Sequence, residues 1–356
     1  MIRFPFKSVQ LAAFLPPLLF SFSPARAQGF GGTVADHLVR GDSLLAQGRG
    51  SEAIVQFQEA RTLCPTAAEI VAALQGEARG RLLMSEPLPA VGLLEEAATR
   101  FPEDPRASNL LYQAGFAAQR SGEVDKAIDL FKKAIDRNPT PDILPPLKFH
   151  LAQAMRLRAR PGDAIEVLKD FEKDFPDHSL LPTVLYTRAI AGHDQGTGDQ
   201  DHGKLRESVA IYRKLIERFP GRPAAIEAHF EMGLVLSELG RGSEAADYFS
   251  KYVSMNPGSP VAAAALEKAA DLTLFRSPKQ SAQYYALAQV KAKANPRPSD
   301  PALGLSRWLP VKQTAADALS RVWVVAILGV VALAVVLIAG RFGLRLIRKI
   351  SHPVGA

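Results

Sequence analysis

The residues best suited to metal chemistry lie in one polar segment, GHDQGTGDQDHGK, at residues 192–204. Imidazole and carboxylate groups bind cations, and the segment contains His193, Asp194, Asp199, Asp201 and His202. The spacing does not fit an EF-hand loop, because Gly203 and Ala210 stand where ligands are needed. We therefore expect a solvated loop inserted between two helices, with no metal and no cofactor.

A second candidate for function is a set of aromatic residues at a regular interval. Tyr112, Phe149 and Tyr186 lie 37 residues apart, and Phe230 follows after 44. Aromatic side chains provide rigid contact area and are enriched where proteins bind each other. The alternative is that these rings only pack between structural units. With their neighbours four residues on, the predicted partner-binding residues are Tyr112, Phe116, Phe149, Gln153, Tyr186, Phe230 and Leu234.

The same interval separates a series of prolines. They are Pro65, Pro102, Pro139, Pro176, Pro220 and Pro257, and only the step that contains residues 192–204 departs from 37, at 44 residues. A small residue stands twelve positions before each proline and a large apolar one eight before, which is one face of a helix. Proline then ends that helix because it has no N–H to donate. An earlier helix precedes each of these, and Gly48, Gly122, Gly203 and Gly240 are expected in the turns between the two.

Residues Gly115, Ala127, Phe131, Ala134 and Pro139 resemble the tetratricopeptide repeat pattern of Gly, Ala, Phe, Ala and Pro. The resemblance covers residues 34–294, with six clear repeats and a degenerate seventh. It implies an all-α solenoid, a right-handed superhelix of helix-turn-helix units, in which the aromatic residues line the concave face. The long repeat is similar to that of periplasmic proteins of the Tol–Pal coordinator and outer-membrane assembly type.

Both ends of the chain carry apolar segments. Residues 1–27 have the basic start, apolar run and Ala-Arg-Ala end of a secretory signal peptide, with an uncleaved anchor as the alternative. Residues 322–340 contain no charge and would span about 29 Å as a helix, so a transmembrane helix is expected there rather than a buried core helix. Residues 295–321 are rich in proline and are expected to form a tether.

The net charge of +7 divides unevenly along the chain. The signal peptide contributes +3 and the tail 341–356 contributes +4, so residues 28–340 are neutral. A basic face for nucleic acid is therefore not predicted. The tail is expected in the cytoplasm and the repeats in the periplasm of a bacterial inner-membrane protein. Cys64 is the single cysteine, which excludes an internal disulfide.

These features favour a membrane-anchored scaffold or adaptor that binds other proteins in the cell envelope. The alternative is a non-catalytic subunit of an inner-membrane complex that contacts a sister subunit through its repeats. An enzyme is not expected, because no catalytic motif is present and the repeats leave no room for a second fold. No small-molecule substrate is predicted.

Overall fold

The computed structural model describes residues 32–63, 66–294 and 309–323. Every regular element in these ranges is a helix, as the sequence predicts. In chain order the helices are α1 Val34–Ala46, α2 Gly50–Thr62, α3 Ala67–Leu83, α4 Pro87–Arg100, α5 Ala107–Ser121, α6 Val124–Asp136, α7 Leu144–Leu157, α8 Pro161–Asp174, α9 Leu181–Gly198, α10 His202–Arg218, α11 Pro223–Glu238, α12 Gly242–Met255, α13 Ala262–Thr273 and α14 Pro278–Ala294. Residues 309–323 form a further helix, called the terminal helix below.

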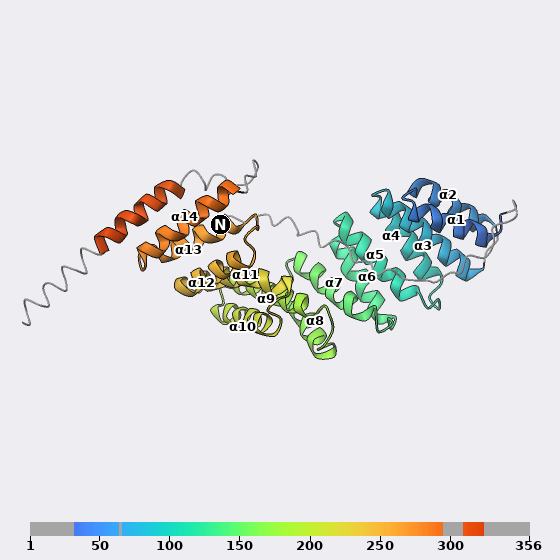
Figure 1. Ribbon diagram of the computed structural model, residues 1–356. Coiled ribbons are helices and arrows are strands. Elements are labelled where there is room, and N and C mark those ends of the chain that lie inside the picture. The colour runs from blue at the N-terminus through green and yellow to red at the C-terminus, as the bar shows by residue number, and fades with distance from the viewer. Residues whose placement is uncertain (1–31, 64–65, 295–308, 324–356) are drawn as a thin grey trace, which may run out of the picture.

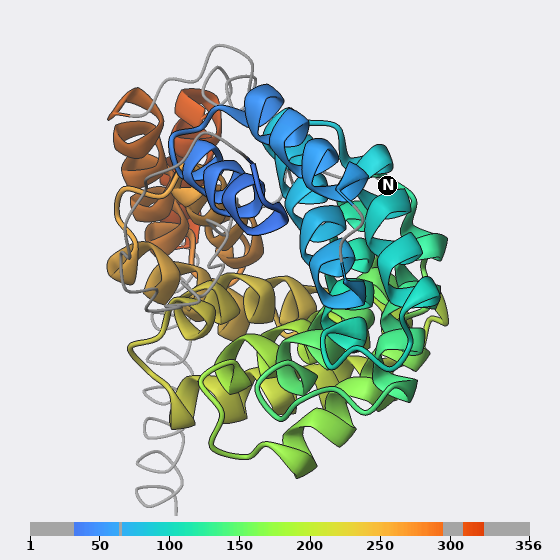
Figure 2. The ribbon, with the colours of Figure 1, turned by 90° about the vertical axis from the view of Figure 1, so that its right-hand side faces the viewer.

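The helices pack in consecutive pairs, from α1 with α2 to α13 with α14, and the pairs stack in chain order (Figure 1). First helices of several neighbouring pairs touch each other, as α1 touches α3, α7 touches both α5 and α9, and α9 touches α11. Within the described residues, no neighbouring second helices pack as closely. A stack bends toward the side on which its helices approach most closely, and Figure 2 shows the chain coiling round. We call the side formed by the first helices the inner face.

The turn within each of the first six pairs contains one residue with a left-handed backbone. These residues are Gly48, Ser85, Gly122, Ala159, Gln200 and Gly240. Three of the four expected glycines are confirmed, but Gly203 lies inside α10, and Gln200 adopts the left-handed backbone instead. The stacking of the helices imposes this conformation, since serine, alanine and glutamine adopt it at a cost in free energy.

The seven extra residues of the fifth pair lengthen helices instead of forming a loop. From Ala159 to Gln200 is 41 residues and from Gln200 to Gly240 is 40, so four extra residues precede the left-handed position and three follow it. Seven residues are about two helical turns, and α9 and α10 are accordingly long, at 18 and 17 residues. The expectation of a solvated loop over 192–204 is therefore wrong. Whole added turns return each helix nearly to its original phase, so they disturb the packing least.

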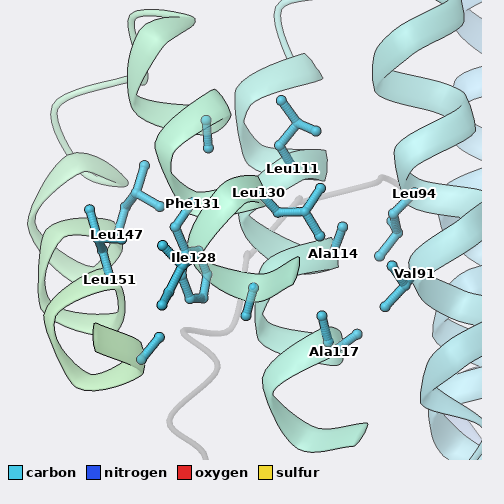
Figure 3. Packing of buried hydrophobic residues seen from close by; sticks show 14 of the residues in the cluster. Val91, Leu94, Leu111, Ala114, Ala117, Ile128, Leu130, Phe131, Leu147 and Leu151 are labelled. Atoms are coloured by element: carbon cyan, nitrogen blue, oxygen red, sulfur yellow. The ribbon is translucent and has the colours of Figure 1, made fainter. Parts of the chain in front are cut away.

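A phenylalanine on the second helix and a glycine on the first pack together in three units. The pairs are Gly41 with Phe57, Gly115 with Phe131, and Gly233 with Phe249. A Cβ atom at position 115 would lie 2.6 Å from the ring of Phe131, far inside van der Waals contact. Figure 3 shows Phe131 in the core, where Leu147 and Leu151 of α7 lie nearby.

Two other units have alanine in place of this glycine and leucine in place of the phenylalanine. They combine Ala78 with Leu94 and Ala152 with Leu168, all fully buried. Leucine is shorter than phenylalanine, so the methyl group of alanine is accommodated. The fifth unit follows neither pattern, with Ala189 and Tyr212. The glycines of the repeat pattern are therefore explained by the size of the side chain opposite them.

The terminal helix packs on the last pair of the solenoid. Leu309 and Ala316 are buried in its core, and the Gln289 side chain donates a hydrogen bond to Gln313 at 2.6 Å. Residues 309–321 of the expected tether are thus helical and packed, while 295–308 lie outside the described residues. The described helices include none that is long and apolar enough to cross a membrane. The expected signal peptide 1–27, most of the expected span 322–340 and the tail 341–356 lie outside the described residues.

Candidate protein-binding face

The four aromatic residues predicted from their spacing occupy equivalent positions on four first helices. Tyr112 lies on α5, Phe149 on α7, Tyr186 on α9 and Phe230 on α11. Because first helices form the inner face, the prediction that these residues belong to one face of the solenoid agrees with the structure. Their role in binding is a separate question, which depends on their exposure.

Two of the four rings are core residues. Phe149 is 6% exposed and Phe230 is 7% exposed. The ring of Phe230 packs edge-on against Phe249 at 5.5 Å and also contacts Tyr252 at 5.4 Å, both on α12 of the same pair. The packing alternative therefore describes these two rings well, since a pair of helices needs large side chains to fill the space between them.

The other predicted residues are half-buried and reach the surface of the inner face. Tyr112 packs on Phe131 at 6.1 Å, and Phe116 meets His150 of the next unit edge-on at 5.5 Å. Burial raises the pKa of Tyr112 to about 12, so its hydroxyl is neutral and can donate a hydrogen bond. Burial also lowers the pKa of His150, which is neutral at physiological pH. Gln153, Tyr186 and Leu234 are likewise partly exposed.

Polar contacts join the first helices of neighbouring units across the inner face. They link Arg79 to Asp42 at 2.9 Å, Gln75 to Gln113 at 3.3 Å, Arg156 to Asp194 at 3.3 Å and His193 to Glu238 at 3.1 Å. Asp194 and His193 were candidate metal ligands by sequence, and both are used here to hold one unit against the next. In the described residues, no group of three or more His, Cys, Asp or Glu side chains is arranged to hold a metal ion.

An acidic region on α9 and α11 was not found by sequence reasoning. Glu227 and Glu231 lie three residues before and one residue after Phe230, and Asp194 is on the neighbouring first helix. Burial, followed by the charges of Asp194 and Glu227, raises the pKa of Glu231 to about 7. Burial also raises the pKa of Glu227. These acids have no counterparts in the other units, so a search for periodicity passes over them, whereas their i, i+4 spacing on one helix would have revealed them.

Two surface pockets lie away from this face. One is between α1 and α2 and is lined by Arg40, Leu44 and Gln56 among others, and the second is on α10 at Arg213 and Arg218. Neither is lined by any of the predicted partner-binding residues. The inner face presents an extended surface of partly exposed side chains, the kind of surface on which polypeptide segments bind.

Helical pairs in a repeating stack, with glycine under a phenylalanine and proline after each second helix, define a tetratricopeptide repeat protein. Solved structures of such proteins share the fold. The C-terminal part of a repeat-containing protein from Cytophaga hutchinsonii aligns over 73% of this chain and 96% of its own, at 14% identity and a TM-score of 0.56. A tetratricopeptide repeat protein from Parabacteroides merdae aligns over 80% and 99%, at 12% identity and a TM-score of 0.51.

The sequence model of the YfiO family, described as an outer membrane lipoprotein, matches residues 90–269, about half of the chain. The chain therefore belongs to this family. It is also 24% identical over 106 residues to the photosystem I assembly protein Ycf3 of Rippkaea orientalis. That match covers 30% of this chain and 60% of the relative. The predicted tetratricopeptide resemblance is confirmed, while the finer resemblance to Tol–Pal coordinators stays a prediction.

Proposed function

We propose that the protein is a membrane-anchored scaffold of the cell envelope that binds segments of other proteins on its inner face. The observation that carries this proposal is the continuous surface of half-buried side chains along α5, α7, α9 and α11. Partly exposed Tyr112, Phe116, Tyr186 and Leu234 offer apolar contact area at low cost in side-chain entropy, because neighbouring rings and helices already hold them.

The envelope location is inferred from two sources. The family description is that of an outer membrane lipoprotein, and the sequence carries the expected signal peptide 1–27 and span 322–340. We place the repeats 34–294 outside the cytoplasm and the basic tail 341–356 inside. Tetratricopeptide families are generally non-catalytic, and Ycf3 is named for an assembly role, which supports an adaptor rather than an enzyme.

Alanine substitutions separate binding from packing. Tyr112→Ala on the full chain in detergent should reduce co-purification of the partner at least fivefold and lower the melting temperature less than Phe230→Ala does, because the ring is only half-buried. Phe230→Ala is the contrasting variant and should lower the melting temperature clearly, since it removes a buried ring. Unchanged co-purification with Tyr112→Ala and Phe116→Ala together would refute binding at this face.

The partner's behaviour decides between an adaptor and a subunit. If the protein is an adaptor, its partners co-purify in less than equal amounts and include soluble or outer-membrane proteins. A membrane partner recovered in equal amounts would instead show a subunit of an inner-membrane complex. Protease added to intact spheroplasts tests the topology, because it should digest the repeats and spare the tail.

A further inference from the structure

Two carboxylates on the inner face of α11 form no ion pair within the described residues. Glu231 has no hydrogen-bond or ion-pair partner among the described residues. The hydrogen-bond partners of Glu227 within the described residues are neutral, the hydroxyl of Tyr252 and the amide of Asn256, the latter at 3.5 Å. The nearby cation, Arg156 of α7, forms its ion pair with Asp194 of α9 at 3.3 Å. The site thus holds two carboxyl groups that form no ion pair within the described part of the chain, although the charge of Arg156 still acts to lower the pKa of Glu231.

A buried hydroxyl in the same place also lacks a partner. Tyr212 of α10 is fully buried, and its hydroxyl oxygen forms no hydrogen bond in the described residues. Its ring meets that of Tyr186 edge-on at 6.2 Å, and the charge of Glu231 acts on it. A buried hydroxyl normally has a partner, because leaving it without one costs free energy. A phenolic hydroxyl can donate a hydrogen bond as well as accept one, and this one does neither within the described residues.

The last unit shows which group such acceptors bind in this chain. Glu267 and Asp271 of α13 stand 37 residues after Phe230 and Leu234, at the equivalent inner-face positions. The ammonium group of Lys312, on the terminal helix, lies 2.6 Å from Glu267 and 3.2 Å from Asp271. It also lies 5.9 Å from the centre of the Tyr285 ring. Here two acids on the inner face, with the buried Tyr285 ring of α14 nearby, receive a lysine from a helix packed against them.

We propose that Glu227 and Glu231 form a binding site for the ammonium or guanidinium group of one basic residue in a partner protein. The flanking side chains Ile190 and Leu234 are partly exposed and apolar. They would contact the neighbouring residues of an extended segment, so the expected ligand is a lysine or arginine between apolar residues. This inference rests on the proposed function, because it names the chemistry of the partner that the inner face takes.

The test uses the full chain in detergent and three fluorescein-labelled peptides, at pH 8 and low salt. All three carry Leu-X-Leu between glycines, where X is lysine, norleucine or glutamate. Anisotropy titrations should show the lysine peptide binding about tenfold more tightly than the norleucine peptide, as expected for one charge-assisted hydrogen-bonded contact. The glutamate peptide should bind least. Glu231→Gln and Glu227→Gln should each remove most of the preference for lysine.

Glu217→Gln is the matched control, because Glu217 is exposed on α10, a second helix, and should leave the preference unchanged. Melting curves of each variant show that lost binding is not lost folding. Equal binding of the three peptides, no binding of any, or a lysine preference that survives Glu231→Gln would overturn the proposal. If partner capture still depends on Tyr112 and Phe116 in that case, the proposed function stands and only the basic-residue site is rejected.

Discussion

At the scale of single residues, the pairing of Gly115 with Phe131 shows what the repeat pattern encodes. Gly115→Ala should destabilise the protein by about 2 kcal/mol, because a Cβ would overlap the ring. Phe131→Leu should cost about 1 kcal/mol alone. The double variant recreates the combination of Ala78 with Leu94, so it should be more stable than the sum of both costs predicts. Chemical denaturation of all three measures this, and strictly additive costs would contradict the pairing.

A second residue-scale prediction concerns Ala159, which has a left-handed backbone in the turn between α7 and α8. Ala159→Gly should stabilise the protein by about 1 kcal/mol, since glycine adopts this conformation without the steric cost. The same substitution at Ala210, exposed within α10, should destabilise by a similar amount. Thermal melting of both variants checks the opposite signs, and a loss of stability at both positions would be contrary to expectation.

The third concerns the ionisation of Glu231. The ordinary pKa of a glutamate is 4.5, and burial raises that of Glu231 to about 7. The folded protein therefore keeps this proton at a pH where the unfolded chain has lost it, and stability falls as pH rises from 4.5 to 7. Glu231→Gln removes that penalty. It should raise the free energy of unfolding by about 3 kcal/mol at pH 8 and by little at about pH 4.5. An equal effect at the two pH values would contradict the raised pKa of Glu231.

At the scale of elements, the terminal helix depends on Lys312. The ammonium group of Lys312 forms ion pairs with Glu267 and Asp271 of α13. Of these two acids, Glu267 is buried. Lys312→Ala leaves Glu267 without its cation, so the terminal helix should detach more often. Hydrogen exchange of residues 309–323 should become about tenfold faster. Lys279→Ala, at an exposed lysine of α14 with no ion pair in the described residues, is the control. Unchanged exchange in Lys312→Ala would show that apolar packing alone holds the helix.

The elements also show how far the sequence predicts the structure. The spacing of prolines such as Pro139 and of residues such as Ala127 and Phe131 predicts the helical pairs well, because each unit must repeat the same packing. The prediction of a loop over 192–204 was wrong because it relied on the polar composition of the segment. The length of the insertion, seven residues or about two helical turns, was the better guide, since it is taken up by longer helices α9 and α10. Gln200 could not be anticipated, since the left-handed conformation there is imposed by neighbouring helices and not by its own preference.

At the scale of the whole molecule, stacking turns a one-dimensional repeat into one continuous face. Sequence spacing placed Tyr112 and Phe230 on that face correctly, but it could not tell the half-buried ring from the buried one, because exposure depends on the neighbouring unit. It also missed Glu231, which belongs to a single unit. The core of a repeat protein is periodic and can be predicted, whereas a residue that occurs in one unit only, such as Glu231, leaves no periodic signal.

Site-specific photo-crosslinking in the protein's own membranes tests binding at the inner face most directly. A photoreactive phenylalanine analogue would replace Phe116 or Gln153 on the inner face, and Lys133 or Arg213 on second helices as outer controls. If partner segments bind along the first helices, discrete adducts with the same protein should form from both inner positions and not from the outer ones. Adducts that form equally from outer positions, or from those alone, would contradict it.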